Sequence, residues 1–201
     1  LEIIHHPEKI DDIEAIVNKN HPAILKLKID ELAAHYLRLR KIREIRKSNL
    51  SNSIKIKNYL RCKLISSLNF ELTKAQKRVI DEILQDLSRN EPMFRLLQGD
   101  VGSGKTIVAL NAILEVIENG YQVAMMAPTE ILATQHYDTF QSMFDEPSVL
   151  LTGSSKKKEH IKNQIYHHEV SIIFGTHALV SKDVIFNHLG LVIIDEQHKF
   201  G

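Results

Sequence analysis

The chain has 201 residues, of which 43% are hydrophobic and 25% are charged, a balance that excludes wholesale disorder and suits one folded domain with an extension. Its apolar runs, such as residues 191–194, are far shorter than the ~20 residues of a membrane helix, and no secretory signal opens the chain, so we expect no membrane association. The single cysteine, Cys62, cannot form an internal disulfide, and we expect a small packed side chain in a protein of the reducing cytoplasm.

The net charge of +1 conceals an uneven distribution along the chain. Residues 1–70 contain 14 lysines and arginines against 8 acidic residues, whereas residues 71–201 contain 12 against 17. The first third is therefore basic and the remainder is acidic. A basic segment is compatible with a partner that carries phosphates, although basic solvated helix faces are also common.

Helices are the elements predicted in the first third of the chain. Apolar residues recur at spacings of three and four over residues 30–47, which predicts a long amphipathic helix. Shorter helices are predicted at residues 11–18 and 54–68. We interpret residues 1–69 as a helical linker segment that leads into an α/β domain at residues 70–201. Because Leu1 opens the chain and an apolar strand lies almost at its end, we expect a fragment.

From residue 70 onward, helical patterns alternate with short apolar runs. Helices are predicted at residues 73–87, 105–118, 131–144 and 158–167. Strands are predicted at residues 93–97, 122–126, 149–151, 170–174 and 191–194. This alternation predicts an α/β fold in which helices cover both faces of a parallel sheet.

Residues 99–106, Gly-Asp-Val-Gly-Ser-Gly-Lys-Thr, match the phosphate-loop pattern G-x-x-x-x-G-K-[ST]. They also have the context that this loop requires, because they follow a predicted strand and open a predicted helix. Glycines let backbone N–H groups approach a phosphate closely, and the helix N-terminus adds about half a positive charge. We therefore expect Lys105 to reach the β- and γ-phosphates of ATP and the Thr106 hydroxyl to ligate Mg²⁺.

Two adjacent carboxylates, Asp195 and Glu196, follow the strand predicted at residues 191–194. In open α/β sheets, ligands bind at the carboxyl ends of the strands. In nucleotide hydrolases this arrangement places the first carboxylate near Mg²⁺ and the second near the attacking water. Together with the phosphate loop, the pair predicts ATP hydrolysis, with Lys105, Asp195 and Glu196 as the catalytic residues.

Several segments together resemble the motifs of superfamily 2 helicases, and those of RecG-type branch-migration helicases in particular. They are residues 70–76, 95–106, 126–133 with 135–136, 151–153, 175–179 and 195–201. The resemblance is dense over residues 70–201 and weaker over residues 30–69. The family usually has arginine where this chain has Lys199, which puts a bidentate role of that side chain in doubt.

The resemblance implies a truncated, P-loop RecA-like first motor domain and, for the full-length protein, an ATP-dependent DNA helicase that acts on branched DNA in recombination and repair. It implies that the nucleotide is bound by Gln76, Gly99, Gly102, Ser103, Gly104, Lys105 and Thr106. It implies that Mg²⁺ is held by Thr106 and Asp195. It implies contacts to the DNA backbone from Pro128, Thr129, Glu130, Thr152, Gly153, Gly175, Thr176 and His177. Gln197 and His198 would couple the nucleotide to the DNA.

Some of these residues have simpler explanations. Thr73 and Gln76 stand in the relation of a capping box at a helix start, so Gln76 could serve the helix as well as adenine. Thr129 could be the N-cap of the helix that follows it. His177 could be an ordinary loop histidine.

Two other functions fit parts of the pattern. The motor of a transcription–repair coupling factor looks similar, but it tends to have Phe where Ser103 stands and Glu where Gln197 stands. A nucleotide-binding module without turnover is the second alternative, because these 201 residues hold neither a second motor domain nor the wedge domain that splits DNA junctions.

The resemblance also places the strand of the next motif between the strands predicted at residues 93–97 and 191–194. That strand would follow Gly201, so two rows of backbone groups would lack partners, at about 1–3 kcal/mol for each buried group. Total stabilities are typically only about 5–15 kcal/mol. We therefore expect the 201 residues alone to be unstable or molten and to bind ATP weakly.

Overall fold

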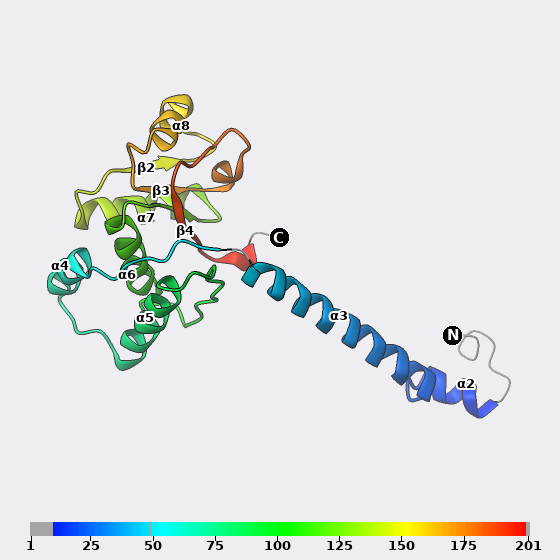
Figure 1. Ribbon diagram of the computed structural model, residues 1–201. Coiled ribbons are helices and arrows are strands. Elements are labelled where there is room, and N and C mark those ends of the chain that lie inside the picture. Colours follow the sequence, from blue (N-terminus) through cyan, green and yellow to red (C-terminus); the bar gives the residue numbers. More distant parts are fainter. Residues whose placement is uncertain (1–9, 49, 200–201) are drawn as a thin grey trace. The chain divides into compact units, whose positions relative to one another are not determined.

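The structure, a computed structural model, describes residues 10–48 and 50–199. It divides into two compact units, Leu1–Leu50 and Ser51–Gly201. The first unit contains helices α2 (Ile10–Val17) and α3 (Pro22–Ser48) (Figure 1). Helix α3 begins eight residues before the predicted start, because proline is well tolerated in a first helical turn and Nδ1 of His21 accepts a hydrogen bond from the Ala23 N–H.

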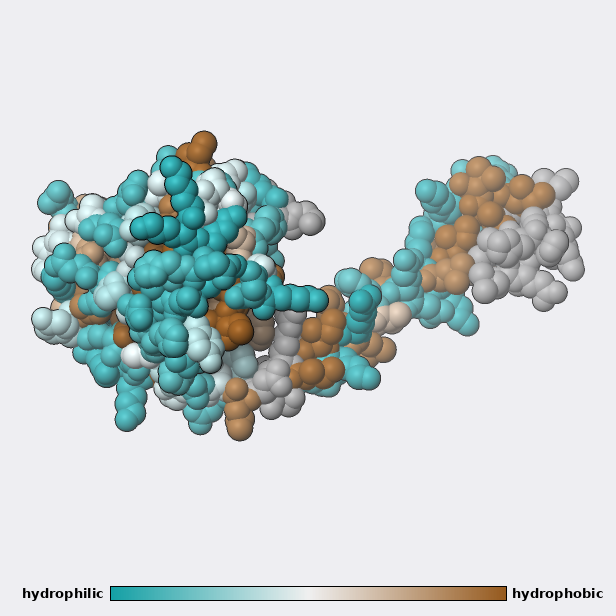
Figure 2. Space-filling view, turned by 90° about the horizontal axis from the view of Figure 1, so that it is seen from above, coloured by the Kyte–Doolittle hydropathy of each residue, from teal (hydrophilic) through white to brown (hydrophobic). Residues whose placement is uncertain are grey.

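The apolar side chains of α3 are not buried within the first unit. Leu32 is 69% exposed and Tyr36 is 63% exposed. In Figure 2 these apolar side chains alternate with charged ones along the helix. The amphipathic pattern therefore predicted the helix correctly, but it says nothing about what covers the apolar stripe.

The second unit is built on one four-stranded sheet. The strands β1 (Gln122–Met126), β2 (Ser148–Leu151), β3 (Ile172–Gly175) and β4 (Leu189–Ile194) lie in the order β2-β3-β1-β4. Every neighbouring pair is parallel, and in this register Val123 lies between Ile172 and Leu191. The predicted parallel sheet is thus confirmed, with the bounds of β1 as predicted and those of β2, β3 and β4 within two residues of the prediction.

The helices of this unit are α4 (Tyr59–Ser67), α5 (Lys74–Leu87), α6 (Lys105–Glu118), α7 (Glu130–Met143) and α8 (Lys158–Tyr166), with 3₁₀ turns η1 (His177–Val180) and η2 (Gln197–Lys199). The bounds of α6 agree with the prediction at both ends. Gly120, with φ of 78°, follows the helix and allows the left-handed turn that ends it.

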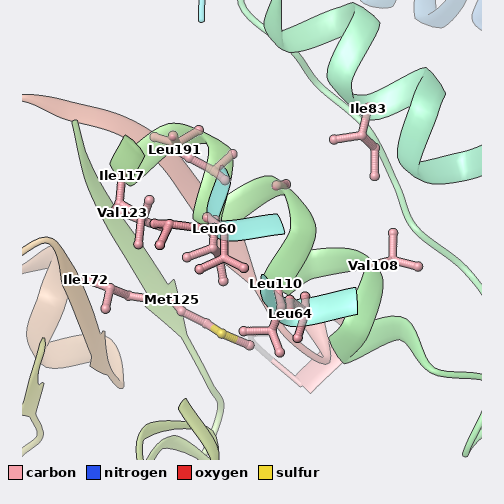
Figure 3. Packing of buried hydrophobic residues seen from close by; sticks show 14 of the residues in the cluster. Leu60, Leu64, Ile83, Val108, Leu110, Ile117, Val123, Met125, Ile172 and Leu191 are labelled. Carbon is pink, nitrogen blue, oxygen red and sulfur yellow. The ribbon is translucent and has the colours of Figure 1, made fainter. Parts of the chain in front are cut away.

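Apolar side chains of β1 alternate between two hydrophobic clusters. Val123 and Met125 pack with residues of α4, α5, α6 and α7, including Leu64 (Figure 3). Ala124 and Met126 pack on the opposite face with residues of α8 and η1. Because successive side chains of a strand point to opposite faces, this alternation places helices on both sides of the sheet, as predicted.

Residues 93–97 do not form the strand that the sequence predicted. Met93 and Leu97 pack partly against the core, whereas Phe94 is 67% exposed and Leu96 is 76% exposed. The guanidinium of Arg95 holds this segment to α5 through ion pairs of 2.6 and 2.7 Å. A strand needs a hydrogen-bonded neighbour in a sheet, and the sheet of the described residues consists of β2, β3, β1 and β4 without this segment.

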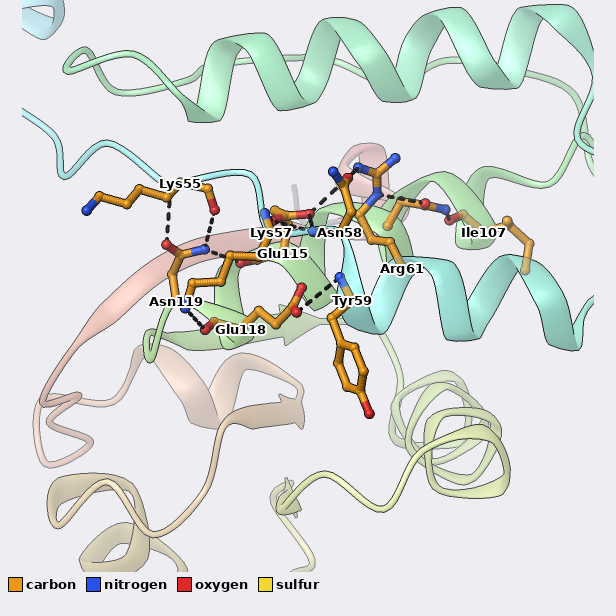
Figure 4. Close-up of polar contacts among 10 residues, drawn as sticks. Lys55, Lys57, Asn58, Tyr59, Arg61, Ile107, Glu115, Glu118 and Asn119 are labelled. Atoms are coloured by element: carbon orange, nitrogen blue, oxygen red, sulfur yellow. Dashed lines mark hydrogen bonds and ion pairs between the residues drawn. The ribbon is translucent and has the colours of Figure 1, made fainter.

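Residues 51–69 belong to the second compact unit, although the sequence analysis grouped them with the linker. The carboxylate of Glu115, on α6, is fully buried and accepts hydrogen bonds from the backbone N–H groups of Lys57 and Asn58 (Figure 4). The guanidinium of Arg61 donates to Asn111 over 3.2 Å. These contacts keep residues 54–58 out of a helix, with Asn58 in the left-handed region at φ of 65°, so α4 begins five residues later than predicted.

Two inferences from composition concern Cys62 and membrane association. Cys62 is exposed rather than packed, because α4 turns Leu60 and Leu64 toward the core instead. As for membrane association, none of the described helices combines the length and the hydrophobicity that crossing a bilayer requires.

Candidate nucleotide and nucleic-acid site

The loop before α6 has the backbone geometry that its glycines allow. Gly102 and Gly104 have φ of 79° and 81°, a left-handed conformation that costs other residues about 1–2 kcal/mol. A Cβ atom on Gly104 would lie 2.4 Å from Nε2 of Gln76, and one on Gly99 would lie 2.7 Å from Oγ of Ser103. Conformation therefore favours glycine at positions 102 and 104, whereas a side chain at position 99 or 104 would displace the tip of Ser103 or Gln76.

The ammonium of Lys105 is held by the carbonyl groups of the same loop. Its Nζ atom lies 2.8 Å from the Gly99 oxygen and 2.9 Å from the Asp100 oxygen. Lys105 is also the first residue of α6, so its charge adds to the positive end of the helix dipole. A cation, a helix N-terminus and close backbone N–H groups together make an anion-binding site.

Gln76 links the start of α5 to this loop. Thr73 and Gln76 form the predicted capping box, in which Gln76 Oε1 accepts from the Thr73 N–H over 2.8 Å. The other end of the same amide, Nε2, donates to the Ser103 carbonyl over 2.9 Å. The capping box is thus confirmed, and Gln76 also lies against the phosphate loop.

Asp195 follows β4 directly, and Glu196 follows Asp195. The Asp195 N–H donates to the Met126 carbonyl over 2.8 Å, which places the first carboxylate at the carboxyl end of the sheet. Glu196 has φ of 51°, and its Oε2 atom lies 3.9 Å from Nζ of Lys199. A left-handed residue other than glycine is strained, and such strain gathers at functional sites.

His136 brings the phosphate-loop helix and Asp195 together. Its Nε2 atom lies 2.8 Å from Oδ2 of Asp195, and its side chain lines a small cavity with Thr106. Sequence reasoning quoted His136 within a motif but gave it no role. The sequence did contain a sign of its role. His136 lies three residues after Ala133 and four before Phe140, on the inner face of α7, and a polar side chain on such a face needs a hydrogen-bond partner.

The residues predicted to contact DNA lie at the same edge of the sheet. Pro128, Thr129 and Glu130 follow β1, whereas Thr152 and Gly153 follow β2. The third group ends or follows β3 and comprises Gly175, Thr176 and His177. Since all the strands are parallel, these three groups and Asp195 share the carboxyl edge, where ligands of open α/β sheets bind.

Thr129 and Glu130 both have partners within the protein. The Thr129 hydroxyl caps α7 by accepting from the Leu132 N–H over 3.3 Å, as the simpler explanation predicted. The Glu130 carboxylate accepts from the Ser154 hydroxyl over 2.5 Å and from the Ser154 N–H over 3.0 Å. These bonds, the hydroxyl bond first, lower the pKa of Glu130. Glu130 therefore ties the turn after β1 to the turn after β2.

Two other predicted DNA contacts are tightly packed. Thr152 is buried, and its hydroxyl lies 3.1 Å from that of Ser154. A Cβ on Gly175 would lie 2.2 Å from the Leu151 carbonyl oxygen, so glycine is needed there for close strand packing. Thr129, Gly153 and His177, in contrast, are exposed at this edge.

The remaining predicted residues lie in or near η2. Gln197 is exposed, whereas the side chain of His198 lies outside the described part of the chain. Within the described residues, no cluster of three or more His, Cys, Asp or Glu side chains could hold a metal. In nucleotide sites, Mg²⁺ is typically held by one or two protein oxygens together with substrate phosphates. The Thr106 hydroxyl and the Asp195 carboxylate can supply those oxygens.

Comparison with known families identifies the family of this chain. The model of the DEAD/DEAH box helicases matches residues 73–201, which include the phosphate loop and both carboxylates. The chain belongs to the DEAD/DEAH box helicase family. Members of this family use ATP, which agrees with the anion-binding geometry of the loop before α6.

The chain is also similar to individual helicases of known sequence and structure. The ATP-dependent DNA helicase RecG of Aquifex aeolicus (strain VF5) is 46% identical over 98% of this chain, and that of Synechocystis sp. (strain ATCC 27184 / PCC 6803 / Kazusa) is 54% identical over 67%. The chain spans 26% and 17% of these two relatives. A solved structure of RecG bound to a three-way DNA junction matches 86% of this chain at 47% identity, with a TM-score of 0.79, and the match covers 24% of that protein.

Proposed function

We propose that the intact gene product is an ATP-driven DNA helicase or translocase that acts on branched DNA, such as stalled forks and Holliday junctions, in recombination and repair. One observation carries the proposal. The phosphate loop with Lys105 and the carboxylates Asp195 and Glu196 stand in one compact unit, whose sheet presents further polar turns at the same edge. Similarity to RecG, solved on a three-way junction, supports the choice of branched DNA.

In this proposal, the loop residues bind the nucleotide. Lys105 exchanges its two loop carbonyls for the β- and γ-phosphates, because anionic oxygens are stronger acceptors of a charged donor than neutral carbonyls. Backbone N–H groups of the loop complete the cradle, and Gln76, already at Ser103, contacts the adenine. The residues assigned to the nucleotide are Gln76, Gly99, Gly102, Ser103, Gly104, Lys105 and Thr106.

Thr106 and Asp195 would hold Mg²⁺, and Glu196 would accept a proton from the attacking water. When bound, Mg²⁺ would neutralise charge on the phosphates during transfer. The strained backbone at Glu196 supports its role, because the left-handed turn directs this carboxylate differently from a residue that continued β4.

The DNA backbone would bind along the carboxyl edge of the sheet, at the exposed Thr129, Gly153 and His177 and at the half-buried Thr176. Glu130 would order this edge rather than contact phosphates, because its carboxylate already binds Ser154. Gln197 and His198 would couple this surface to the nucleotide. Because such contacts read phosphates rather than bases, sequence preference should be slight. A protein of this kind would work in the cytoplasm.

The test is ATP hydrolysis by the intact gene product with a three-way junction, with linear duplex and without DNA. The junction should stimulate hydrolysis most, and stimulation should fall steeply with salt as counterion release weakens binding. Lys105→Ala should reduce the rate about 10²–10³-fold, as the loss of a charge-stabilising donor does. Glu196→Gln should bind ATP but not hydrolyse it. An ATPase indifferent to all DNA, or an unimpaired Glu196→Gln variant, would contradict the proposal.

A further inference from the structure

His136 makes the closest described contact to the Asp195 carboxylate. The contact joins His136 Nε2 to Asp195 Oδ2 over 2.8 Å, and the two side chains are 15% and 29% exposed. It engages one carboxylate oxygen, which leaves Oδ1 of the same group as a second acceptor or ligand. A hydrogen bond to one oxygen fixes the rotation of the carboxylate, so the second oxygen is held in a defined direction.

The surroundings of His136 make it a rigid donor. It lies on the inner face of α7, one turn before the fully buried Phe140. The small cavity that it lines is otherwise formed by Thr106, Thr139 and apolar side chains, among them Met125 and Phe174. The imidazole thus stands between the first turn of α6 and the end of β4, the two places that supply the proposed Mg²⁺ ligands.

We infer that His136 is a positioning residue for Asp195, which it orients to hold the Mg²⁺ of a bound nucleotide. The inference rests on the proposed function, in which Asp195 has that role. Ligating carboxylates are commonly oriented by a hydrogen bond from an outer residue, and loss of such a partner lowers metal affinity about 10–100-fold. A merely structural histidine would affect folding and leave the dependence on Mg²⁺ unchanged.

The test measures nucleotide binding instead of turnover. The intact gene product carries Glu196→Gln, so that ATP is not consumed, and binding of a fluorescent ATP analogue is followed as Mg²⁺ is titrated. His136→Leu keeps an apolar side chain of similar volume but removes the donor. His136→Gln offers an N–H at a similar reach. Asp138→Ala changes an exposed residue of α7 and serves as the matched control.

His136→Leu should raise the Mg²⁺ concentration for half-maximal binding about 10–100-fold, with unchanged binding in EDTA. His136→Gln should restore most of the loss, and Asp138→Ala should match the parent. A parental Mg²⁺ midpoint in His136→Leu overturns the inference, as does an equal loss of binding with and without Mg²⁺.

Asp195→Asn on the same background separates this inference from the proposed function. If the Mg²⁺ midpoint shifts in Asp195→Asn but stays parental in His136→Leu, the role of His136 is rejected and the proposed Mg²⁺ site stands. A parental midpoint in Asp195→Asn rejects the proposed Mg²⁺ site, and the inference falls with it. Thermal unfolding of each variant shows whether it is folded. If His136→Leu does not fold, the midpoint of His136→Gln decides, and a shift beyond tenfold overturns the inference, since the replacement amide should hold Asp195.

Discussion

The two ends of helix α6 both carry charged residues, but their hydrogen bonds serve different purposes. Near the C-terminal end, the Glu115 carboxylate is fully buried and accepts from backbone N–H groups of Lys57 and Asn58, 57 or more residues away along the chain (Figure 4). At the N-terminal end, the Lys105 ammonium binds only carbonyls five and six residues away, in a solvent-accessible loop.

This difference separates groups that build the fold from groups that await a ligand. A buried charge whose partners are distant parts of the chain cannot change partners without unfolding. A cation that rests on the carbonyls of its own loop can exchange them for phosphate oxygens at little cost. The comparison predicts that substitutions near Glu115 lower stability, whereas substitutions near Lys105 lower nucleotide affinity.

The largest effect is expected from Glu115→Ala. This substitution leaves the Arg61 guanidinium, 3.7 Å from the Glu115 carboxylate and nearly buried, without its counter-charge. Removal of one partner from a buried pair typically costs about 3–5 kcal/mol. Urea unfolding of the intact gene product measures the loss. The matched control is Glu159→Ala, whose side chain is 85% exposed, and which should change stability by less than about 0.5 kcal/mol. If Glu115→Ala and Glu159→Ala lost equal free energy of unfolding, the Glu115 contacts would have no special role in stability.

A smaller and more selective effect is expected at two glycines that flank α6. Gly104 and Gly120 have φ of 81° and 78°, so alanine at either site should cost about 1–2 kcal/mol of stability. A Cβ on Gly120 meets nothing within 4 Å, whereas one on Gly104 lies 2.4 Å from Nε2 of Gln76. Gly104→Ala should therefore also break the contact between Gln76 and Ser103 and weaken ATP binding about tenfold, which is the value of one hydrogen bond.

Gly120→Ala is the control for Gly104→Ala. Both variants strain the backbone, but only Gly104→Ala displaces the side chain of Gln76. Calorimetric titration with ATP should show parental affinity for Gly120→Ala. If the two variants lost the same affinity, strain alone would account for both, and Gln76 would have no role at the nucleotide.

The parts of this fold that could be predicted from sequence depend on local chemistry. The bounds of α6 follow from the glycines on either side of it, and the capping box of Thr73 and Gln76 involves residues three positions apart. Strand β1 is a short apolar run between clear helix signals. The phosphate loop and the two carboxylates could be recognised because their spacing is set by the chemistry of phosphate binding.

The parts that could not be predicted depend on distant partners. Residues 93–97 have the apolar character of a strand, but they lie outside the sheet that β2, β3, β1 and β4 form among the described residues. Residues 54–58 were predicted to be helical, and their bonds to Leu87, Glu115 and Asn119, which are distant in sequence, explain why they are not. His136 meets Asp195 across 59 positions, a separation at which no periodic pattern carries information.

The smallest predicted effect concerns Glu130, on α7, whose contacts share features with those of both Glu115 and Lys105. Its carboxylate, like that of Glu115, binds a distant segment through Ser154, but like Lys105 it lies in contact with solvent. The Ser154 hydroxyl and N–H lower the pKa of Glu130 in the folded protein. A lowered folded-state pKa means that the bond stabilises the protein above the ordinary glutamate pKa and that this contribution is lost as pH falls through the folded-state value.

The melting temperature of Glu130→Gln should therefore lie slightly below that of the parent at pH 7, and this difference should shrink as the pH is lowered from about 5 toward 3. Thermal unfolding at half-unit pH steps provides the measurement, with Glu159→Gln as the control on an exposed glutamate of α8. Amide exchange at Ser154 should rise in Glu130→Gln at neutral pH, because the turn after β2 loses its anchor. A difference that grew as the pH fell would reverse the sign that the lowered pKa requires. It would show that Glu130 destabilises this edge in its charged form.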